Sequence, residues 1–156
     1  MEKIAVFAGS FDPFTLGHES VVLRSADLFD KIFVAVGVHS GKKPLMKIAS
    51  RVRMIRDVFA GQENIVPDYF EGLTVDYCRR VNATHMLRGI RTAADFEYER
   101  AVAQINKRML PEVESIFLLT SPEHTPINST LIRDIIRNGG DASQFLPAGI
   151  DIRNYL

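Results

Sequence analysis

Two nearly continuous apolar runs constrain the fold of this chain more than any other feature. The segments Lys3–Ala8 and Lys31–Val38, with the sequences KIAVFA and KIFVAVGV, are rich in β-branched residues. Such runs are typical of strands that are buried on both faces of a parallel sheet. Between them, Glu19–Phe29 spaces its apolar residues in a loosely helical pattern. The three segments therefore predict a strand, a helix and a parallel strand in succession, which is a βαβ unit.

The same alternation continues along the rest of the chain. The sequence predicts further strands over Asn64–Tyr69, His85–Leu87 and Ser115–Leu119, and further helices over Ile48–Phe59, Val75–Val81 and Leu131–Arg137. The last of these helices ends at an Asn-Gly-Gly stop signal. The tail, residues 141–156, is predicted to be a loop with a short helix.

One predicted helix is longer than the others. It begins at Thr92, which forms a capping-box-like start with Asp95, and it precedes the last strand. Its apolar residues recur at helical spacing, and this stripe consists of Tyr98, Val102, Ile105 and Met109. With this helix in place, five strands alternate with helices. We therefore expect an α/β fold with an open, mostly parallel, doubly wound sheet.

The length and composition of the chain indicate one globular domain. Its 156 residues suit a single domain, residues 1–156, and 46% of them are hydrophobic. Nineteen basic residues balance nineteen acidic ones, so we expect neither nucleic acid nor a membrane as a partner. No apolar run approaches the roughly 20 residues of a membrane span, and the N-terminal run ends too early for a signal peptide. We expect a cytoplasmic protein whose single cysteine, Cys78, is a packing residue.

The loop after the first strand contains the most unusual residues. In doubly wound sheets, ligands bind beyond the carboxyl ends of the strands. Here the stretch FAGSFDPFTLGH offers Gly9 for close backbone approach, the Ser10 hydroxyl, Thr15 as a helix cap and His18 in the first helical turn. The helix N-terminus suits phosphate and disfavours a charged imidazole, so we expect His18 to be neutral without a bound anion. Taken alone, the stretch fits an ordinary turn and a surface histidine equally well.

Basic residues follow two other strands of the predicted sheet. Lys42 and Lys43 follow the second strand, where a lysine pair is usually just solvated, but the neighbouring first loop favours a role in binding. Arg88 and Arg91 follow the fourth strand, and two guanidinium groups there can each hold a phosphate. Either arginine can instead pair with a nearby carboxylate, Asp95 or Glu99. We do not expect both arginines to do so.

The loop after the fifth strand is compatible with two interpretations. Asn128, Ser129 and Thr130 stand where the last helix begins, so they are helix caps or they hold a phosphate or adenine, and the sequence alone does not choose. His85 is interpreted as a packing or surface residue, with His39 and His124 at the rim of the site. The chain has no zinc-ligand spacing, P-loop, GxGxxG fingerprint or GxSxG elbow.

Together these stretches resemble the signatures of one enzyme superfamily. GSFDPFTLGH is similar to the (H/T)xGH signature of the nucleotidyltransferases, with Thr15-Leu16-Gly17-His18 as the TxGH element, and INSTLIR, Ile127–Arg133, resembles their second signature. Three further pieces, in matching order and spacing, resemble the bacterial phosphopantetheine adenylyltransferase family: Lys42-Lys43-Pro44, the run RGIRTAADFEYE over Arg88–Glu99, and Phe145–Pro147. The resemblance covers nearly all of the chain.

The resemblance implies a fold, a reaction and partners. It implies a Rossmann-like doubly wound sheet of five parallel strands flanked by helices. The implied reaction transfers the adenylyl group of ATP reversibly to 4′-phosphopantetheine, giving dephospho-coenzyme A and pyrophosphate. It also implies Mg²⁺ with ATP, a homohexamer, and coenzyme A as a feedback inhibitor. In this mechanism the acceptor phosphate attacks the α-phosphate of ATP directly, without a base or a covalent enzyme intermediate. The enzyme positions the two substrates and neutralises their negative charge.

The resemblance also implies roles for individual residues. The implied catalytic residues are His18, Ser10, Lys42 and Arg91; His18 donates to the α-phosphate, and Lys42 bridges the two substrates. Implied nucleotide contacts are Gly9, Ser10, Phe11, His18, Gly89, Ile90, Arg91, Glu99, His124, Thr125, Pro126, Ile127, Asn128, Ser129 and Thr130. Implied acceptor contacts are Ser10, Lys42, Thr74 and Arg88. No residue is expected to hold a metal ion directly.

Some positions depart from the family pattern, and other functions compete. Phe7-Ala8 stands where Tyr-Pro is usual, His124 where tryptophan is frequent, and Asn128 where serine is common. The nearest rival is a nucleotidyltransferase that acts on nicotinate mononucleotide, or that uses CTP with a phosphorylated alcohol. A rival from another class is a non-catalytic module that senses ATP or coenzyme A.

Overall fold

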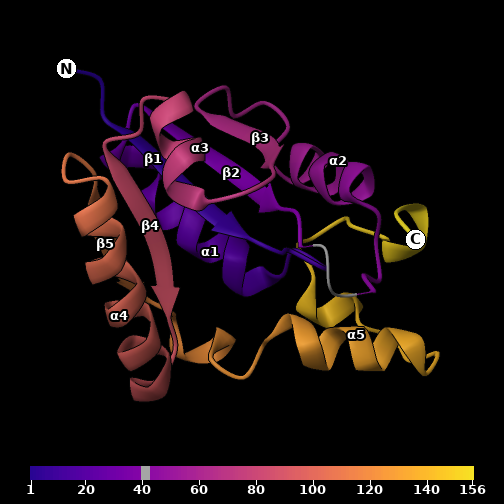
Figure 1. Cartoon of the computed structure of the whole chain (residues 1–156). Coiled ribbons are helices and arrows are strands. Elements are labelled where there is room, and N and C mark those ends of the chain that lie inside the picture. Colours follow the sequence, from indigo (N-terminus) through magenta and orange to yellow (C-terminus); the bar gives the residue numbers. More distant parts are fainter. Residues whose placement is uncertain (40–42) are drawn as a thin grey trace.

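The computed structural model describes residues 1–39 and 43–156, which form a five-stranded parallel sheet with helices around it (Figure 1). The strands are β1 (Ile4–Gly9), β2 (Lys31–Gly37), β3 (Ile65–Phe70), β4 (His85–Ile90) and β5 (Glu114–Leu119), in the spatial order β3-β2-β1-β4-β5. All five predicted strands are confirmed. Only β4 is clearly longer than expected, because Arg88, Gly89 and Ile90 continue its pairing with β5.

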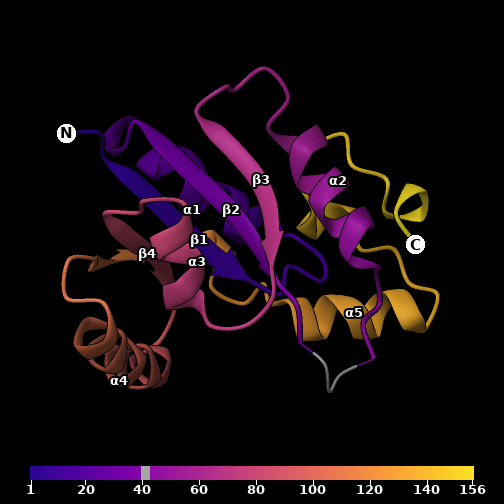
Figure 2. The same ribbon diagram turned by 45° about the horizontal axis from the view of Figure 1, so that its top comes forward.

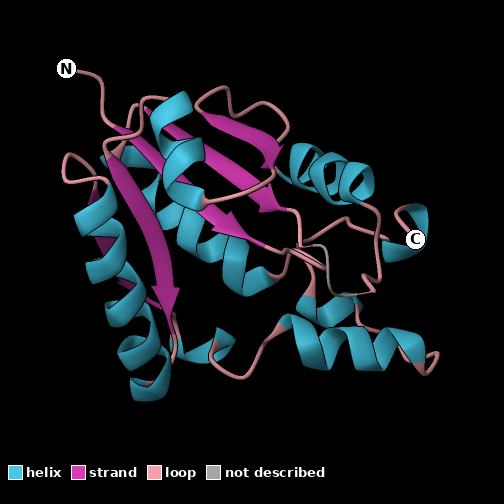
Figure 3. Ribbon diagram, in the orientation of Figure 1, coloured by secondary structure: helices cyan, strands magenta, loops and turns pink. Residues whose placement is uncertain are grey.

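The five long helices follow the strands in the predicted order (Figure 3). They are α1 (Leu16–Ser25), α2 (Ile48–Val58), α3 (Thr74–Arg80), α4 (Ala93–Met109) and α5 (Ser129–Arg137). The first helix begins and ends earlier than predicted, and a 3₁₀ turn over Ala26–Leu28 completes it. The tail contains two 3₁₀ turns, Ser143–Phe145 and Ile152–Asn154, where we expected one short helix.

Helices cover both faces of the sheet, so the sheet is doubly wound as predicted (Figure 1). Because successive side chains of a strand point to opposite faces, Phe7 of β1 belongs to one core with α1, α2 and α5, while Val6 belongs to a second core with α3. Cys78 of α3 is fully buried in this second core. Burial raises the pKa of its thiol to about 11, as for a packing residue.

The predicted apolar stripe of α4 is not buried. None of the 17 residues of this helix is buried, and Tyr98, Ile105 and Met109 are 70%, 57% and 39% exposed. The prediction of a helix was correct, but its apolar stripe does not face a core. The reason is the position of the helix: α4 lies at the β4–β5 edge of the sheet (Figure 2) and packs mainly against these two strands, so much of its surface stays exposed.

The strand order determines where the sheet can bind a ligand. From β1 the chain builds outward to β2 and β3, and then returns to add β4 and β5 on the other side. The neighbours β1 and β4 therefore form the switch point of the sheet, where the loops beyond the carboxyl ends separate and leave a crevice. Within the described residues, no helix has the length and apolar composition needed to cross a membrane.

Candidate functional site

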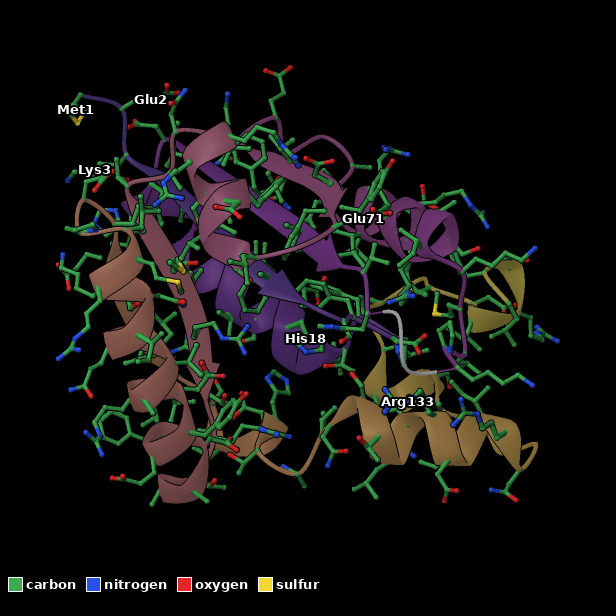
Figure 4. All side chains as sticks on the ribbon, in the orientation of Figure 1. Met1, Glu2, Lys3, His18, Glu71 and Arg133 are labelled. Atoms are coloured by element: carbon green, nitrogen blue, oxygen red, sulfur yellow. The ribbon has the colours of Figure 1, made fainter. Side chains whose placement is uncertain are left out.

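A cavity of about 580 Å³ opens beyond the carboxyl ends of β1 and β4, and we call it the His18 cavity. It brings together most of the residues selected from the sequence: Gly9, Ser10, Phe11, His18, Arg88, Gly89, Arg91, Glu99, His124, Ile127, Asn128, Ser129 and Thr130. Figure 4 labels two lining residues from distant parts of the chain, His18 on α1 and Arg133 on α5. The loops after β1, β4 and β5 therefore meet in one place.

Several selected residues do not line the His18 cavity. Ile90 is buried in β4, Thr125 is half-buried in the loop after β5, and Pro126 is exposed in the same loop. Thr74 lines a second cavity that is described below. Lys42 lies outside the residues that the structure describes.

A capping box fixes His18 at the start of α1. Thr15 is the N-cap residue, and its Oγ1 accepts a hydrogen bond from the His18 N–H at 3.5 Å. In return, the Thr15 N–H donates to Nδ1 of His18 at 3.0 Å. Both residues stand where the sequence predicted them. Because a backbone N–H can only donate, Nδ1 must be the unprotonated nitrogen, and the neutral ring carries its proton on Nε2.

Three phenylalanine rings surround the His18 imidazole. The ring centroids of Phe11, Phe14 and Phe7 lie 5.0, 5.3 and 6.3 Å from that of His18. This burial is the main reason why the pKa of His18 is lowered from 6.5 to about 3, and the charges of Arg88 and Arg91 lower it further. His18 is therefore neutral at neutral pH. The sequence analysis predicted a neutral ring from the helix dipole, whereas burial and two arginines account for it here.

Arg88 is fixed by two partners. Its Nε and Nη2 donate to the two carboxylate oxygens of Glu99 at 3.0 and 2.6 Å, and its Nη1 donates to the Ala8 carbonyl. This forked geometry combines charge with orientation. The side chain of Glu99 is only 12% exposed, which limits the screening of the pair by water. These bonds use three of the five guanidinium N–H groups and leave one on each Nη for a ligand.

Arg91 also forms an ion pair. Its Nε lies 3.3 Å from Oδ2 of Asp95, and its Nη1 donates to the Ile127 carbonyl at 3.3 Å. The expectation that Arg88 and Arg91 are not both paired was therefore wrong. Asp95 and Glu99 are four residues apart on α4, so they lie on one face of the helix. That face presents both carboxylates to the end of β4.

The start of α5 combines the two interpretations of the last loop. Asn128 is a helix cap, because its Oδ1 accepts the hydrogen bond of a backbone N–H in the first turn. The Ser129 hydroxyl is also used internally, because it donates to the Pro13 carbonyl at 2.9 Å. Among the described residues, however, no hydrogen bond uses the N–H groups of Ser129 and Thr130, which line the His18 cavity. Free N–H groups at a helix N-terminus suit a phosphate.

A second cavity, of about 350 Å³, adjoins the first, and we call it the Thr74 cavity. Its separate wall combines α4 with β5 and with the carboxyl ends of β2 and β3, and it includes Gly37, His39, Phe70, Thr74, Val102 and Asn106. Six residues line both cavities: Ala8, Gly9, Ser10, Arg88, Tyr98 and Glu99. A molecule in one cavity therefore lies next to a molecule in the other at Ser10 and Arg88.

Sequence analysis did not assign roles to three of the lining residues. Arg133 lines the His18 cavity and donates to the Asp12 carbonyl at 2.9 Å. It lies four residues after Ser129, so helical spacing places both on one face and would have indicated it. Tyr98 and Asn106 line the Thr74 cavity from positions about two turns apart on α4. We attributed Tyr98 to an apolar stripe, whereas Asn106 lies four residues after Val102 of that stripe and gave no signal of its own.

The remaining histidines have different surroundings. His85 Nδ1 lies 2.8 Å from the Thr84 hydroxyl and its ring packs near Phe29, whereas exposed His39 lines the Thr74 cavity. Nδ1 of His124 is buried without a hydrogen-bond partner among the described residues. The described residues contain no group of three or more His, Cys, Asp or Glu side chains that could hold a metal ion.

The donors of the His18 cavity suit a phosphate-bearing ligand. Three guanidinium groups, those of Arg88, Arg91 and Arg133, line the cavity together with the N–H groups at the start of α5. His18 adds a neutral N–H donor. Because the only carboxylates that line this cavity, Asp95 and Glu99, are already paired with arginines, the described site favours anions over cations.

Sequence comparison relates most of the chain to known proteins. Residues 6–135 match the family described as cytidylyltransferase-like. The chain is 44% identical over 149 residues to the phosphopantetheine adenylyltransferase of Flavobacterium psychrophilum, and the match covers 96% of this chain and 98% of that protein. It is 43% identical over 145 residues to the protein of the same name from Caldanaerobacter subterraneus, covering 93% of this chain and 91% of that protein. The resemblance drawn from the motifs is confirmed.

Solved structures confirm the fold. A putative nicotinate-nucleotide adenylyltransferase from Vibrio parahaemolyticus matches with a TM-score of 0.70 and 19% identity, covering 94% of this chain and 88% of that chain. A bifunctional NMN adenylyltransferase/ADP ribose pyrophosphatase from Francisella tularensis, complexed with AMP and a manganese ion, matches with a TM-score of 0.67 and 17% identity. That match covers 98% of this chain but only 46% of the longer chain.

Proposed function

The chain belongs to the phosphopantetheine adenylyltransferase family, within the cytidylyltransferase-like proteins, and we propose that it transfers the adenylyl group of ATP reversibly to 4′-phosphopantetheine. The products are dephospho-coenzyme A and pyrophosphate, so the enzyme acts in coenzyme A biosynthesis.

The observation that carries this proposal is the shared wall of the two cavities. ATP occupies the His18 cavity, and the pantetheine arm occupies the Thr74 cavity. The acceptor phosphate then lies at Ser10 and Arg88, which line both cavities. From there it is adjacent to the α-phosphate of ATP, as an in-line displacement requires.

His18 stabilises the charge that develops at the α-phosphate. Because Nδ1 accepts the Thr15 N–H, the proton on Nε2 is available to a phosphoryl oxygen. Before a phosphate binds, the low pKa keeps the ring in this neutral form. His18 therefore acts as a preoriented hydrogen-bond donor, and removal of one such donor typically costs about 10²–10³ in rate. No proton has to be removed from the acceptor phosphate, which is already nucleophilic.

Each arginine of the site neutralises the phosphate charge of one of the two substrates. Arg88, fixed by Glu99, holds the acceptor phosphate, and Glu99 thus acts through Arg88. Arg91 and Arg133 hold the phosphates of ATP together with the start of α5. Lys42 bridges the two substrates in this proposal, which for Lys42 rests on the family resemblance because the residue lies outside the described part of the chain.

Magnesium enters with the nucleotide in this proposal. Mg²⁺ prefers carboxylate, water and phosphate oxygens, whereas Asp95 and Glu99 in the His18 cavity are paired with arginines. The triphosphate is therefore the main source of ligands for the ion. When bound, the ion supplies charge neutralisation to the pyrophosphate that leaves.

Three further proposals follow from family membership. We infer a homohexamer, and the exposed apolar residues of α4 support an oligomer because such surfaces are typical of interfaces. Coenzyme A is a feedback inhibitor in this proposal, since it shares the pantetheine arm and adenine of the substrates. Finally, residues 1–156 act as one cytoplasmic domain, and the continuous sheet and the buried free thiol of Cys78 are consistent with this.

An acceptor assay tests the proposed function. The protein is given ATP with either 4′-phosphopantetheine or nicotinate mononucleotide, or CTP with glycerol phosphate, and pyrophosphate release is measured. We expect release only with 4′-phosphopantetheine. Release with nicotinate mononucleotide alone would refute the proposed acceptor. ATP binding without release from any pair would instead favour a non-catalytic sensor.

A further inference from the structure

A buried carboxylate joins the two loops that follow β1 and β2. Asp12, in the loop after β1, is 6% exposed. Its Oδ2 accepts the Leu45 N–H and its Oδ1 accepts the Met46 N–H, both at 2.9 Å. Leu45 and Met46 belong to the segment that follows the lysine pair. Asp12 therefore holds this segment against the loop that contains Ser10.

A buried guanidinium group, that of Arg51, also joins the same two loops. Arg51, in the first turn of α2, is also 6% exposed. Its Nε donates to the Met46 carbonyl at 3.0 Å, and its Nη1 donates to the Ser10 carbonyl at 2.8 Å. One planar group thus fixes two backbone carbonyls, one in each loop. Only an arginine side chain presents two donors in such a rigid fork.

The charges of the two residues are balanced within this cluster. Burial lowers the pKa of the Arg51 guanidinium, the Asp12 carboxylate raises it, and the charge of Arg133 lowers it. Arg133 itself reaches the cluster through the Asp12 carbonyl. Removal of either Asp12 or Arg51 therefore removes one of two opposite buried charges and leaves the backbone groups bonded to it without their partners, which is unfavourable.

Neither residue lines a substrate cavity. Among the described residues, the His18 and Thr74 cavities include Ser10 but neither Asp12 nor Arg51. Because the hydrogen bonds of the two side chains within the described part of the chain all go to backbone groups of the two loops, their influence on chemistry passes through Ser10 and the segment after β2. A displacement of about 1 Å at a reacting group can cost on the order of 10² in rate.

We propose that Arg51 and Asp12 are positioning residues that clamp the Ser10 loop to the segment following β2, and so set the alignment of the nucleotide and the acceptor phosphate. This inference rests on the proposed adenylyl transfer. It adds two residues outside the substrate cavities to those on which the reaction depends.

The first experiment uses Arg51→Lys, which keeps the buried positive charge but cannot fix both carbonyls. We expect kcat to fall about tenfold or more, while KM for ATP changes less than about threefold. Circular dichroism and the denaturation midpoint establish that the variant is folded at the assay temperature. The matched control is Arg56→Lys on the same helix, where the arginine is exposed, and it should keep wild-type kinetics.

A double-mutant cycle distinguishes positioning from a general loss of structure. In wild-type protein, Ser10→Ala and Arg91→Ala each remove a proposed substrate contact. In the Arg51→Lys background, Ser10→Ala should cost much less than in wild type, because its backbone is already released. Arg91→Ala should cost the same in both backgrounds, since Arg91 is held by Asp95 and Ile127.

Hydrogen exchange supplies a readout that does not depend on activity. The Leu45 and Met46 amides, which donate to Asp12, should exchange faster in Arg51→Lys, while amides of β4 should not change. Unchanged exchange at Leu45 and Met46, or equal costs of Ser10→Ala in both backgrounds, would overturn the clamp. The kinetics use whichever acceptor the wild-type protein turns over, so a wrong acceptor and a wrong role for Arg51 give different results.

Discussion

The backbone N–H of Thr15 donates to Nδ1 of His18 across 3.0 Å, and this one bond determines which imidazole nitrogen can face a ligand as a donor. The bond exists because Thr15 caps α1 and His18 occupies the third position of the helix, where capping boxes usually have Glu or Gln. The same turn that begins the helix therefore also selects the tautomer of the proposed catalytic group.

Replacement of His18 should separate turnover from binding. His18→Ala removes the Nε2 donor but no charge, because the ring is neutral. We expect kcat to fall about 10²–10³-fold, while the dissociation constant of ATP, measured by calorimetry, changes less than about fivefold because arginines supply most of the phosphate contacts. A folded His18→Ala protein with wild-type kcat would rule out the donor role.

The stability of the protein should depend on pH through His18. Its pKa is lowered from 6.5 to about 3 on folding, so the unfolded chain binds more protons between these values. The free energy of unfolding therefore falls as the pH drops below about 6.5. In His18→Gln this contribution is absent. When the pH is lowered from about 7.5 to about 5, the free energy of unfolding measured by urea titration should fall by up to about 2 kcal/mol more in wild type than in His18→Gln. An equal fall in the free energy of unfolding of both proteins would contradict the low pKa of His18.

Glu99 should act through Arg88. Glu99→Gln removes the charge that orients the guanidinium, so we expect KM for the acceptor to rise about tenfold while KM for ATP stays nearly constant. The matched control is Glu97→Gln on the same helix, which breaks only the exposed pair with Arg100 and should leave both KM values unchanged. A selective effect of Glu99→Gln on ATP would instead place Glu99 at the nucleotide.

Substitution of Gly9 should destabilise the protein because of the Phe11 ring. A Cβ atom at Gly9 would lie 2.9 Å from Cε1 of Phe11, which is buried and has a left-handed backbone with φ of 47°. Gly9→Ala must displace this ring, which also packs against His18, and should lower the free energy of unfolding by about 1–3 kcal/mol. Addition of Phe11→Leu should recover part of the loss.

Gly17→Ala is the contrasting variant for that measurement. A Cβ at Gly17 meets only ordinary contacts, 3.6 Å from Oγ1 of Thr15 and 3.9 Å from Cβ of His124. Because alanine also favours the helix by up to about 1 kcal/mol, we expect no loss of stability in the same thermal or urea titration. Equal destabilisation by both substitutions would show that the Phe11 ring is not the cause.

The fold was predictable because its signals are local. Apolar runs such as Lys31–Val38 are too uniform for half-exposed strands, and the helices between them have clear starts and stops. The ends of the strands were harder to predict, because pairing with a neighbouring strand determines where a strand stops. Arg88, Gly89 and Ile90 have no strand pattern of their own, yet they extend β4 because β5 offers them backbone partners.

The site was predictable in its membership but not in its internal contacts. Motif spacing indicated His18, Arg88 and Arg91, whereas the two ion pairs depend on the face of α4 that is turned to the sheet. Arg51 gave no signal, because an arginine on an amphipathic helix is normally interpreted as exposed. Its burial against the Ser10 and Met46 carbonyls is visible only in three dimensions.

The parallel direction of all five strands also places both cavities at the carboxyl ends of the strands and leaves the amino ends at the opposite side of the sheet. At the amino ends, the turns are joined to one another, for example by the Asp30 N–H to the Lys3 carbonyl at 2.8 Å and the Glu114 N–H to the Thr84 carbonyl at 3.1 Å. A six-residue strand spans about 20 Å, so exposed positions there, such as Glu63 and Asn82, lie roughly that far from the His18 cavity. A fluorophore or an immobilising tag attached at that end can report on the protein without obstructing either cavity.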